Sequence, residues 1–557
     1  MWLAWLSPNH YPPWAAAHSE LLAALALCAL SAAAATSAVH RVQKGRAVPL
    51  PSIFFAAMAA IPLTQWGGGR LLFFGDAWIV ALYLSAVALA TWSAARLEQW
   101  RPGVVVDLLA TALLAGALAT CFVTLAQRAA VDLGPWALYV VDVRPGRPPI
   151  GNMAQPNQTA MLCALGLVAL LYLHDRQRVR SVLAGGALVV LILSQAATLS
   201  RAPGLLWTVA LVAVVVMRSR FRCAALPVVV GLSAVAWGLC YWAWTQVPFI
   251  GMPARGAEVL AARLEVGPRT TMWLQLAQAV GQEPWLGWGW NQVSVAQWAV
   301  ALRFPDSRMT EHSHNLPLDL MLWTGVPLAV VLMVTSGVWL AGAARRAVDA
   351  GAAAALLIVL LLLTHSMVEF PLDYLYFLVP FAMAIGVMSS RMAIAAAPAK
   401  WPGFRAFKPL AIAAPLVVAV CAADYWRVET AFRELRFAVA RIGQVPAELP
   451  RPPLSLFTQL TARMSLPLHK PTRGMEADVL QSMTDATRRY ATPSDIARLA
   501  LAQGLNGNHR AAQDSLQLLL HLHGSVHHAS ARAEFARLAD SEYPELRLVI
   551  GTDPLPR

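Results

Sequence analysis

Residues 351–368 read GAAAALLIVLLLLTHSMV, an uninterrupted apolar run with one ionisable side chain, His365. A run of this length and composition predicts a helix that spans a membrane. Eleven further apolar runs occur, and none alternates between apolar and polar positions, which excludes a closed barrel. The sequence therefore predicts an all-α fold, a polytopic membrane helical bundle of about 12 spans. The predicted spans are 21–39, 48–65, 77–95, 104–126, 158–173, 181–199, 203–217, 223–243, 316–341, 351–368, 375–390 and 409–423.

The composition agrees with a membrane protein. Hydrophobic residues make up 58% of the chain and charged residues 13%, whereas a soluble domain carries about a quarter charged residues. All six cysteines fall inside or at the edge of predicted spans, so neither a disulfide framework nor a cysteine-based metal site is expected. Residues 1–14 have no apolar core of their own, and no cleavable signal peptide is expected.

The formal charge of +13 would suit nucleic-acid binding, but the positions of the charges indicate membrane topology instead. Six short connections contain 17 basic residues in 51, whereas the intervening loops contain 10 in 143. Basic residues gather in the cytoplasmic loops of membrane proteins. Loops 127–157 and 244–315, and the tail from 424, are therefore predicted to be external, and no nucleic-acid partner is expected. The basic, predicted cytoplasmic connections are 40–46, 96–101, 174–180, 218–222, 343–350 and 391–408.

This topology divides the chain into four regions. They are N-terminal membrane helices in 1–243, a large external loop in 244–315, further membrane helices in 316–423 and a soluble helical C-terminal domain in 424–557. Within the loop, Pro268–Gln282 has the apolar spacing of an amphipathic helix, and Gly287–Asn291 has the composition of a tight aromatic turn. The tail predicts helices near 424–443, 475–490, 493–505, 508–523 and 527–541.

An amide-rich motif, GNMAQPNQ at residues 151–158, stands where an external loop enters a predicted span. Uncharged amides offer hydrogen-bond donors and acceptors together, which suits sugar hydroxyls or a phosphate. Gln155, Asn157 and Gln158 are therefore candidate substrate-binding residues. The alternative interpretation is a polar helix cap, in which Asn157 would be an ordinary capping residue.

Two arginines are placed where an anion could bind. Arg201 lies in a short external turn between two spans, where an arginine either snorkels or binds an anion. Arg269 lies at the start of the helix predicted in the large loop, and a helix N-terminus already attracts anions. The planar guanidinium group suits phosphate. Snorkelling of Arg201 and simple solvation of Arg269 are the competing interpretations.

The segment EHSHN, residues 311–315, gathers a carboxylate, two histidines and an amide at the edge of a predicted span. Histidine can accept a proton near neutral pH, so His312 and His314, with Asn315, are candidate site residues. The spacing of the two histidines would also fit a metal, but no HExxH pattern or cysteine accompanies them. An interfacial polar cap is the alternative.

A second histidine motif lies at the outer end of the predicted span 351–368. His365 and Glu369 are four residues apart and would share a helix face, and Tyr374 follows. Ionisable groups within a membrane segment are functional candidates by default. A structural ion pair between His365 and Glu369 is the competing interpretation.

Four segments together resemble the motifs of PglL-type bacterial protein O-oligosaccharyltransferases, within the wider O-antigen ligase and polymerase superfamily. They are GNMAQPNQ (151–158), EPWLGWGWNQ (283–292), EHSHNLPLDLMLWTGVPL (311–328) and HSMVEFPLDYLYFLVP (365–380). PNHYPPWAAAHSE at 8–20 fits the same pattern, and the resemblance covers most of the chain. Family members usually carry a membrane helix before this element, whereas only Met1 to Ser7 precede it here.

The resemblance implies an enzyme that moves an oligosaccharide en bloc from undecaprenyl pyrophosphate to a serine or threonine of an exported protein such as pilin. It implies that His314 is catalytic and that Arg201 and Arg269 hold the pyrophosphate. It also implies a bacterial inner-membrane location among membrane lipids, a site in the periplasmic loop, no cofactor and no metal. The alternatives are an O-antigen ligase acting on the lipid A core, a glycan polymerase and a lipid-glycan transporter. The substrate-binding candidates are Gln155, Asn157, Gln158, His312, Asn315, His365, Glu369 and Tyr374.

Overall fold

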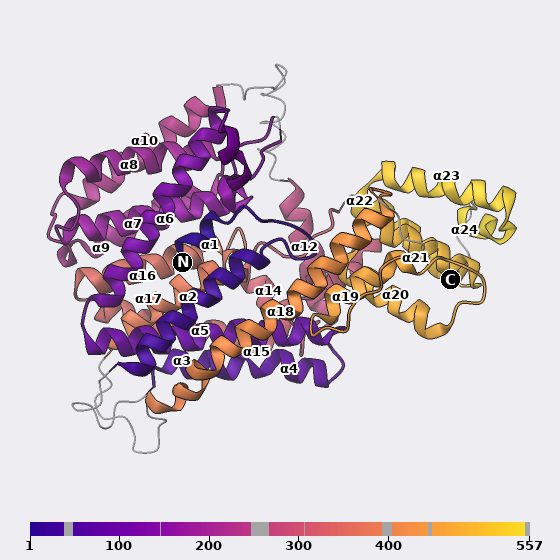
Figure 1. Cartoon of the computed structure of the whole chain (residues 1–557), viewed down its shortest axis with the longest axis horizontal. Coiled ribbons are helices and arrows are strands. Elements are labelled where there is room, and N and C mark those ends of the chain that lie inside the picture. Colours follow the sequence, from indigo (N-terminus) through magenta and orange to yellow (C-terminus); the bar gives the residue numbers. More distant parts are fainter. Residues whose placement is uncertain are drawn as a thin grey trace. The chain divides into compact units, whose positions relative to one another are not determined.

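The chain folds into helices throughout the part that the structure describes (Figure 1). This structure is a computed structural model, and it describes residues 1–37, 48–144, 146–246, 267–305, 307–392, 404–443 and 448–551. The predicted all-α class is therefore confirmed. Connection 40–46 and parts of 244–315 and 391–408 lie outside the described residues.

The described chain forms two compact units. The first comprises Met1–Ala59, Leu82–Leu264 and Thr335–Ala422, and the second comprises Ala60–Ala81, Glu265–Val334 and Ala423–Arg557.

Long apolar helices dominate the fold. Within the described ranges, eight helices are long and apolar enough to cross a membrane, and four shorter apolar helices accompany them. These helices coincide with the apolar runs that the sequence predicts as spans, and the count of twelve crossings stays a prediction. The long helices are α2 (Ala17–Thr36), α3 with α4 (Leu50–Met58 and Ala60–Gly67), α5 (Phe74–Trp100), α6 (Val104–Arg128), α7 (Pro156–Asp175), α10 (Leu226–Gln246), α15 (Val326–Arg346) and α18 (Lys408–Val439). The shorter ones are α8 (Ser181–Ala197), α9 (Ala202–Val216), α16 (Ala350–His365) and α17 (Leu375–Arg391).

Two predicted boundaries were wrong. The run 316–341 is two helices, α14 (Leu316–Thr324) and α15, because the chain turns at Gly325. Gly325 has φ +77, and a Cβ there would lie 2.3 Å from the Trp285 carbonyl oxygen, so only glycine fits this turn. The runs 409–423 and 424–443 are one 32-residue helix, α18, since no glycine or proline separates them.

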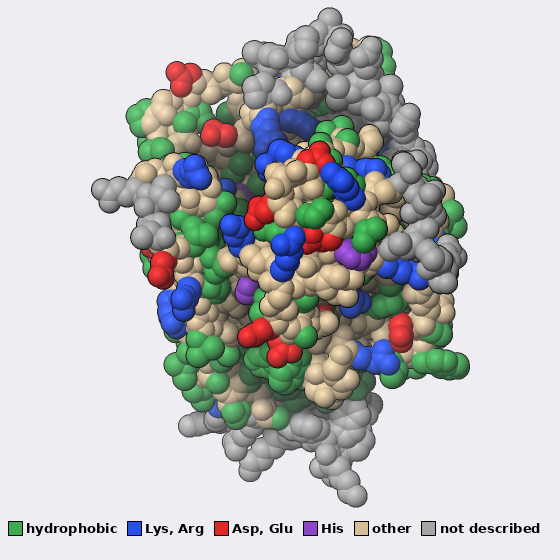
Figure 2. Space-filling model, turned by 90° about the vertical axis from the view of Figure 1, so that its right-hand side faces the viewer, with side chains coloured by type: hydrophobic (Ala, Val, Ile, Leu, Met, Phe, Trp, Pro, Cys, Tyr) green, Lys and Arg blue, Asp and Glu red, His purple; other side chains and the backbone are tan. Residues whose placement is uncertain are grey.

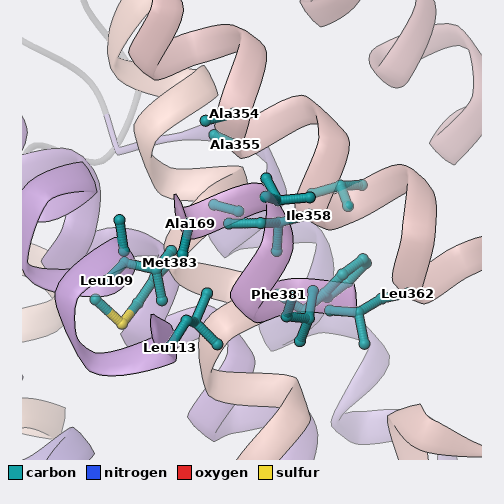
Figure 3. Close-up of a cluster of buried hydrophobic side chains, with 14 of the residues drawn as sticks. Leu109, Leu113, Ala169, Ala354, Ala355, Ile358, Leu362, Phe381 and Met383 are labelled. Atoms are coloured by element: carbon teal, nitrogen blue, oxygen red, sulfur yellow. The ribbon is translucent and has the colours of Figure 1, made fainter. Parts of the chain in front are cut away.

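The core of the first unit combines large apolar side chains with small residues at which helices approach closely (Figure 3). Ala354 and Ala355 of α16 are buried against α7 and α17, and Leu109 and Leu113 of α6 complete the cluster. On α7, a Cβ at Gly166 would lie 2.4 Å from the Ala117 Cβ of α6. Small residues at helix contacts are typical of membrane bundles, where close packing drives association.

The six cysteines are all free thiols. Cys121 of α6 and Cys163 of α7 are fully buried side by side, with their sulfurs 3.8 Å apart. Cys28 is buried too, whereas Cys223, Cys240 and Cys421 are partly exposed.

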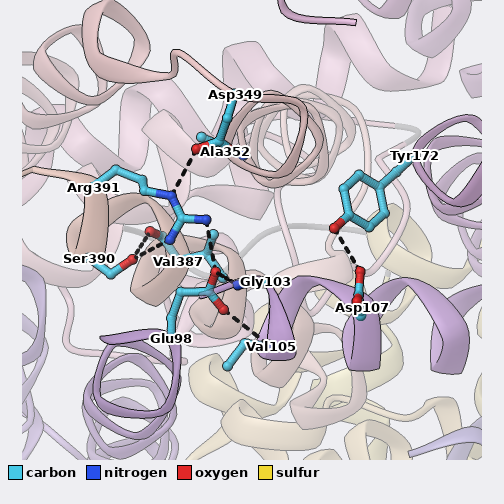
Figure 4. Close-up of polar contacts among 10 residues, drawn as sticks. All are labelled: Glu98, Gly103, Val105, Asp107, Tyr172, Asp349, Ala352, Val387, Ser390 and Arg391. Atoms are coloured by element: carbon cyan, nitrogen blue, oxygen red, sulfur yellow. Dashed lines mark hydrogen bonds and ion pairs between the residues drawn. The ribbon is translucent and has the colours of Figure 1, made fainter. Parts of the chain in front are cut away.

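A buried carboxylate ties together helix ends that are predicted to face the cytoplasm (Figure 4). Glu98 accepts hydrogen bonds from the Gly103 and Val105 N–H groups, at 2.6 and 3.0 Å, and from Arg391 at 2.8 Å. Arg391 also pairs with Asp349, which caps α16. Burial opposes ionisation of Asp349, but the Ala352 N–H and Arg391 outweigh it and lower its pKa.

The second unit contains the helices predicted in the large loop and the tail. Lys/Arg, Asp/Glu and His side chains are scattered over the face in Figure 2, which looks onto the C-terminal helices. This pattern is typical of a solvated surface. The helices are α12 (Gly267–Gln282), α13 (Val293–Val300), α19 (Thr458–Ser465), α20 (Ala477–Tyr490), α21 (Pro493–Leu505), α22 (His509–His523), α23 (Ser525–Ser541) and α24 (Arg547–Ile550).

Candidate functional site

The amide motif is a rigid turn that leads into α7. Gly151 has φ +57, and a Cβ there would lie 3.0 Å from the Thr159 hydroxyl, so glycine is needed at this position. Gln127 of α6 accepts from the N–H groups of Ile150 and Gly151, at 3.1 and 2.8 Å. Gln155 is the N-cap of α7, since its side-chain oxygen accepts from the Gln158 N–H at 2.6 Å. The capping interpretation therefore holds for Gln155 and not for Asn157.

Asn157 brings the motif to Arg201. Its side-chain oxygen accepts a hydrogen bond from the Ser200 hydroxyl at 2.6 Å. Ser200 is buried, whereas Arg201, the next residue, is exposed at the start of α9. Arg201 thus directly follows a residue that is hydrogen-bonded to the amide motif, and its exposed side chain can meet an anion without being desolvated first.

Gln158 connects the motif to α17. The Tyr376 hydroxyl donates to the Gln158 side-chain oxygen at 2.7 Å, and the Tyr376 ring stacks on that of Tyr374, with centroids 5.0 Å apart. His365 and Glu369 are both buried, and they line one crevice with Gln158. This crevice is too narrow to admit a water molecule, and it is lined by Gln155, Asn157, Gln158, His365, Glu369, Phe370 and Pro371. The first unit therefore gathers both predicted polar motifs into one place.

Residues of the N-terminal segment form hydrogen bonds to this cluster. Trp5 donates its indole N–H to the Tyr376 carbonyl at 3.1 Å, and Glu20 accepts from the Leu375 N–H at 2.7 Å. Asn152 donates to the carbonyls of Leu6 and Tyr139, both at 2.8 Å. Glu20 and Asn152 lie within segments that the family resemblance already marked, whereas Trp5 was missed because its contact joins residues that are 371 positions apart.

His314 has an uncommon backbone conformation. Its φ is +54, in the left-handed region, which costs a non-glycine residue on the order of 1–3 kcal/mol. Asn315, the next residue, caps α14 by accepting from the Leu318 N–H at 3.2 Å. Asp319 accepts from the Ser313 N–H at 3.0 Å, and the Ser313 hydroxyl bonds to the Asn315 backbone. The predicted polar cap is thus present, and it fixes the histidine in a strained turn.

Helix α12 places Arg269 near this turn. Trp273 donates its indole N–H to the Ser313 carbonyl at 2.8 Å, immediately before His314. Arg269 lies four residues earlier on α12, and residues four apart share one face of a helix. The large loop therefore carries Arg269 and His314 on adjoining elements of the second unit. Sequence reasoning missed Trp273 and Asp319, although both stand within predicted motifs.

A tight turn holds α12 against α14. Gly287 and Gly289 have φ +68 and +103, as expected for the predicted aromatic turn. The Trp288 N–H donates to the Leu322 carbonyl at 2.7 Å, and the Val326 N–H donates to the Pro284 carbonyl at 2.8 Å. This turn fixes the helix that carries Arg269.

The candidate residues thus form two clusters. Arg201 and the amide and second histidine motifs lie in the first unit, and Arg269, His312, His314 and Asn315 lie in the second. The convergence of Arg201 with Arg269 and His314 stays a prediction. Among the described residues, no group of three or more His, Cys, Asp or Glu side chains is arranged to hold a metal ion.

Three protein families match consecutive parts of the chain. The family described as protein glycosylation ligase matches residues 149–174, which include the amide motif. The family described as O-antigen ligase matches residues 186–333, which include Arg201, Arg269 and His314. The family described as the C-terminal part of a virulence-factor membrane-bound polymerase matches residues 353–537, which include the second histidine motif.

Two proteins of Acinetobacter baylyi are similar in sequence. A general O-oligosaccharyltransferase is 26% identical over 405 residues, which cover 70% of this chain and 68% of that protein. A ComP-specific O-oligosaccharyltransferase is 26% identical over 242 residues, which cover 43% of this chain and 44% of that protein.

Proposed function

Because the chain is related to the PglL-type protein O-oligosaccharyltransferases and the O-antigen ligases, we propose that it transfers an oligosaccharide en bloc from undecaprenyl pyrophosphate to a serine or threonine hydroxyl. The acceptor is an exported protein such as pilin. The enzyme is a multi-pass protein of the bacterial inner membrane, and its active site faces the periplasm. The charge distribution between spans supports this orientation.

The observation that carries the proposal is the strained turn at His314. A left-handed backbone at a histidine persists only where its surroundings enforce it, and such strain gathers at functional sites. Trp273, Asp319 and the Asn315 cap enforce it here. Arg269 lies one helical turn from Trp273. The proposed base, His314, and a cation, Arg269, therefore lie on neighbouring elements.

In the proposed reaction, the acceptor hydroxyl attacks the anomeric carbon of the glycan. His314 accepts the hydroxyl proton as the new C–O bond forms. The bond between the anomeric carbon and the phosphate oxygen breaks, and undecaprenyl pyrophosphate leaves with the electron pair. Arg201 and Arg269 stabilise the charge that develops on the diphosphate. A single displacement of this kind inverts the anomeric configuration.

The uncharged groups have a separate role in the proposal. The amide motif, with His365 and Glu369, binds hydroxyl or phosphate groups of the donor. Tyr374 closes the same cluster through its stacking on Tyr376. His312 and Asn315 flank His314 and are further substrate-binding candidates in this proposal.

The test is glycan transfer by the purified chain, with a lipid-linked oligosaccharide as donor and a candidate pilin as acceptor. Intact-mass analysis of the pilin should show one glycan mass added by the wild-type chain and none by His314→Ala at equal protein level. His527→Ala, which changes an exposed histidine of α23, is the matched control and should transfer normally. Wild-type rates in His314→Ala would remove this residue from the mechanism.

A second candidate is an O-antigen ligase that uses the same donor and the lipid A core as acceptor. It is favoured by the match to the O-antigen ligase family, which spans 186–333 and contains both arginines. Glycan on lipopolysaccharide, with none on pilin, would decide for this candidate. Movement of the lipid-linked glycan across the membrane without any transfer would indicate a transporter instead.

A further inference from the structure

The C-terminal end of α22 lies against the chain that leads to the His314 turn. His521 Nδ1 is 2.9 Å from the Ala301 carbonyl, a distance at which the ring N–H donates to the oxygen. The Met309 N–H donates to the Leu522 carbonyl at 3.2 Å. Two neighbouring residues at the end of one C-terminal helix therefore hold the backbone on both sides of Phe304.

Packing joins the same two segments. Ala301 is fully buried within a cluster whose other members are C-terminal residues, among them Leu519 and Leu522. Met309 packs against this cluster as well. The chain before the His314 turn is thus part of the hydrophobic core of the C-terminal helices, and it cannot shift without opening that core.

A hydrogen-bonded path continues from this core to the turn itself. Gln297 of α13, which is fully buried, donates to the Arg308 carbonyl at 2.8 Å and accepts from the Thr310 N–H at 2.9 Å. The Thr310 hydroxyl donates to the His312 carbonyl at 2.5 Å. Each residue from 308 to 310 therefore has its backbone held by α13 or α22, and the next held residue, His312, lies two positions before His314.

A second contact anchors α13 to the C-terminal helices. The Ser294 hydroxyl donates to the Arg489 carbonyl at 2.8 Å, and both residues are buried. The Arg489 side chain makes two hydrogen bonds to Asp76, at 3.0 and 3.1 Å. Helices α13 and α22, which hold residues 308–310, are thus both packed within the second unit.

We propose that the C-terminal helices position the His314 turn for catalysis, with His521 as the positioning residue. This inference rests on the proposed function, in which His314 is the base. Proton transfer requires the base within about 3 Å of the hydroxyl, so a small displacement of the turn lowers the rate. The expected effect is therefore on the chemical step.

The test compares two substitutions at His521. His521→Leu removes the donor to the Ala301 carbonyl, whereas His521→Gln keeps an N–H donor of similar reach. His527→Leu, which changes an exposed histidine on α23, is the control. We expect His521→Leu to lower kcat by roughly tenfold to a hundredfold with an unchanged acceptor KM, and His521→Gln to restore most of kcat. A raised acceptor KM at normal kcat would overturn the proposal.

Hydrogen–deuterium exchange of the full chain gives a readout that does not depend on activity. In His521→Leu, amides of residues 307–315 should exchange faster, while those of α20 should be unchanged. Unchanged exchange in residues 307–315 would overturn the positioning role. Faster exchange there, together with normal activity of His314→Ala, would uphold the positioning of the turn and reject the proposed function instead.

Discussion

The Tyr376 hydroxyl donates to the side-chain oxygen of Gln158 at 2.7 Å, across 218 residues of sequence, and both residues are buried. This bond joins the amide motif at the start of α7 to the start of α17. It also fixes which way the Gln158 amide points, because the oxygen must face Tyr376 and the NH2 group must face elsewhere.

Tyr376→Phe should therefore weaken donor use without unfolding the chain. Removal of the hydroxyl leaves the buried Gln158 oxygen without this donor, a loss of about 1–3 kcal/mol that falls on the motif itself. We expect a donor KM raised by roughly tenfold. The measurement is initial rate against donor concentration, with Tyr11→Phe, an exposed tyrosine, as the control. An unchanged donor KM would show that Gln158 does not take part in donor binding.

The two arginines should act on the same ligand group. Arg201→Ala and Arg269→Ala are each expected to raise the donor KM and lower kcat, because each removes charge stabilisation from the leaving diphosphate. If both contact one diphosphate, the double variant should lose less than the product of the two single losses. Kinetics of the four chains with a lipid-linked donor check this. Normal donor use in both single variants would exclude the arginine clamp.

Transfer should proceed without a divalent metal ion. In the proposed mechanism the guanidinium groups of Arg201 and Arg269 supply the positive charge that a metal supplies elsewhere. Activity should therefore be the same before and after treatment with EDTA. Loss of activity that is restored by a divalent ion would show that the arginines are not sufficient.

The ion pair between Arg489 and Asp76 should contribute more to the stability of the fold than an ion pair on the surface does. Both side chains are buried, and the pairing with Asp76 raises the pKa of Arg489 against the opposing effect of burial. Arg489→Met leaves the Asp76 carboxylate buried without its partner, which costs about 3–5 kcal/mol. We expect a lower thermal unfolding temperature. Asp76→Asn combined with Arg489→Met should recover part of the loss, and a double variant as unstable as the single would contradict this account.

The C-terminal helices should lose stability in mild acid. Burial lowers the pKa of His523 and of His528, and in His523 it outweighs the hydrogen bond with the Ala491 carbonyl. A histidine whose folded-state pKa lies below its unfolded value of about 6.5 binds fewer protons when folded. Its contribution to stability is therefore present above about pH 6.5 and is lost as the pH falls through the folded-state pKa.

Limited proteolysis of the full chain at about pH 7.5 and pH 5.5 checks this. Cleavage between α22 and α23 should be faster at the lower pH. His523→Gln combined with His528→Gln should reduce the difference, because glutamine does not titrate. Equal cleavage of the wild-type chain at both pH values would rule out a contribution from these histidines.

Much of the fold followed from local sequence. Run length predicted the membrane helices, and apolar spacing predicted α12 and the C-terminal helices. The break at Gly325 was missed, although Gly325 with Pro327 two residues later is a local pattern of a helix end followed by a new helix. What decides the break is the approach of the Trp285 carbonyl, a contact that the local pattern does not contain.

The candidate site, like the fold, was predicted only in part from local sequence. The capping roles of Gln155 and Asn315 are local, and motif composition was enough to mark both regions. The residues that fix the motifs, such as Tyr376 for Gln158 and Trp273 for Ser313, act across 218 and 40 residues. Sequence patterns identify the polar groups that bind or react, whereas the supports that aim them depend on tertiary packing.

The distribution of the thiols makes distance measurements between the two candidate clusters practical. Cys28, Cys121 and Cys163 are buried, so water-soluble maleimides have no access to them. Only Cys223, Cys240 and Cys421 need to be replaced before new cysteines are introduced near Arg201 and near His314. Spin labels or bifunctional cross-linkers at those two positions would then measure the distance between the arginine and the histidine in the membrane-embedded protein.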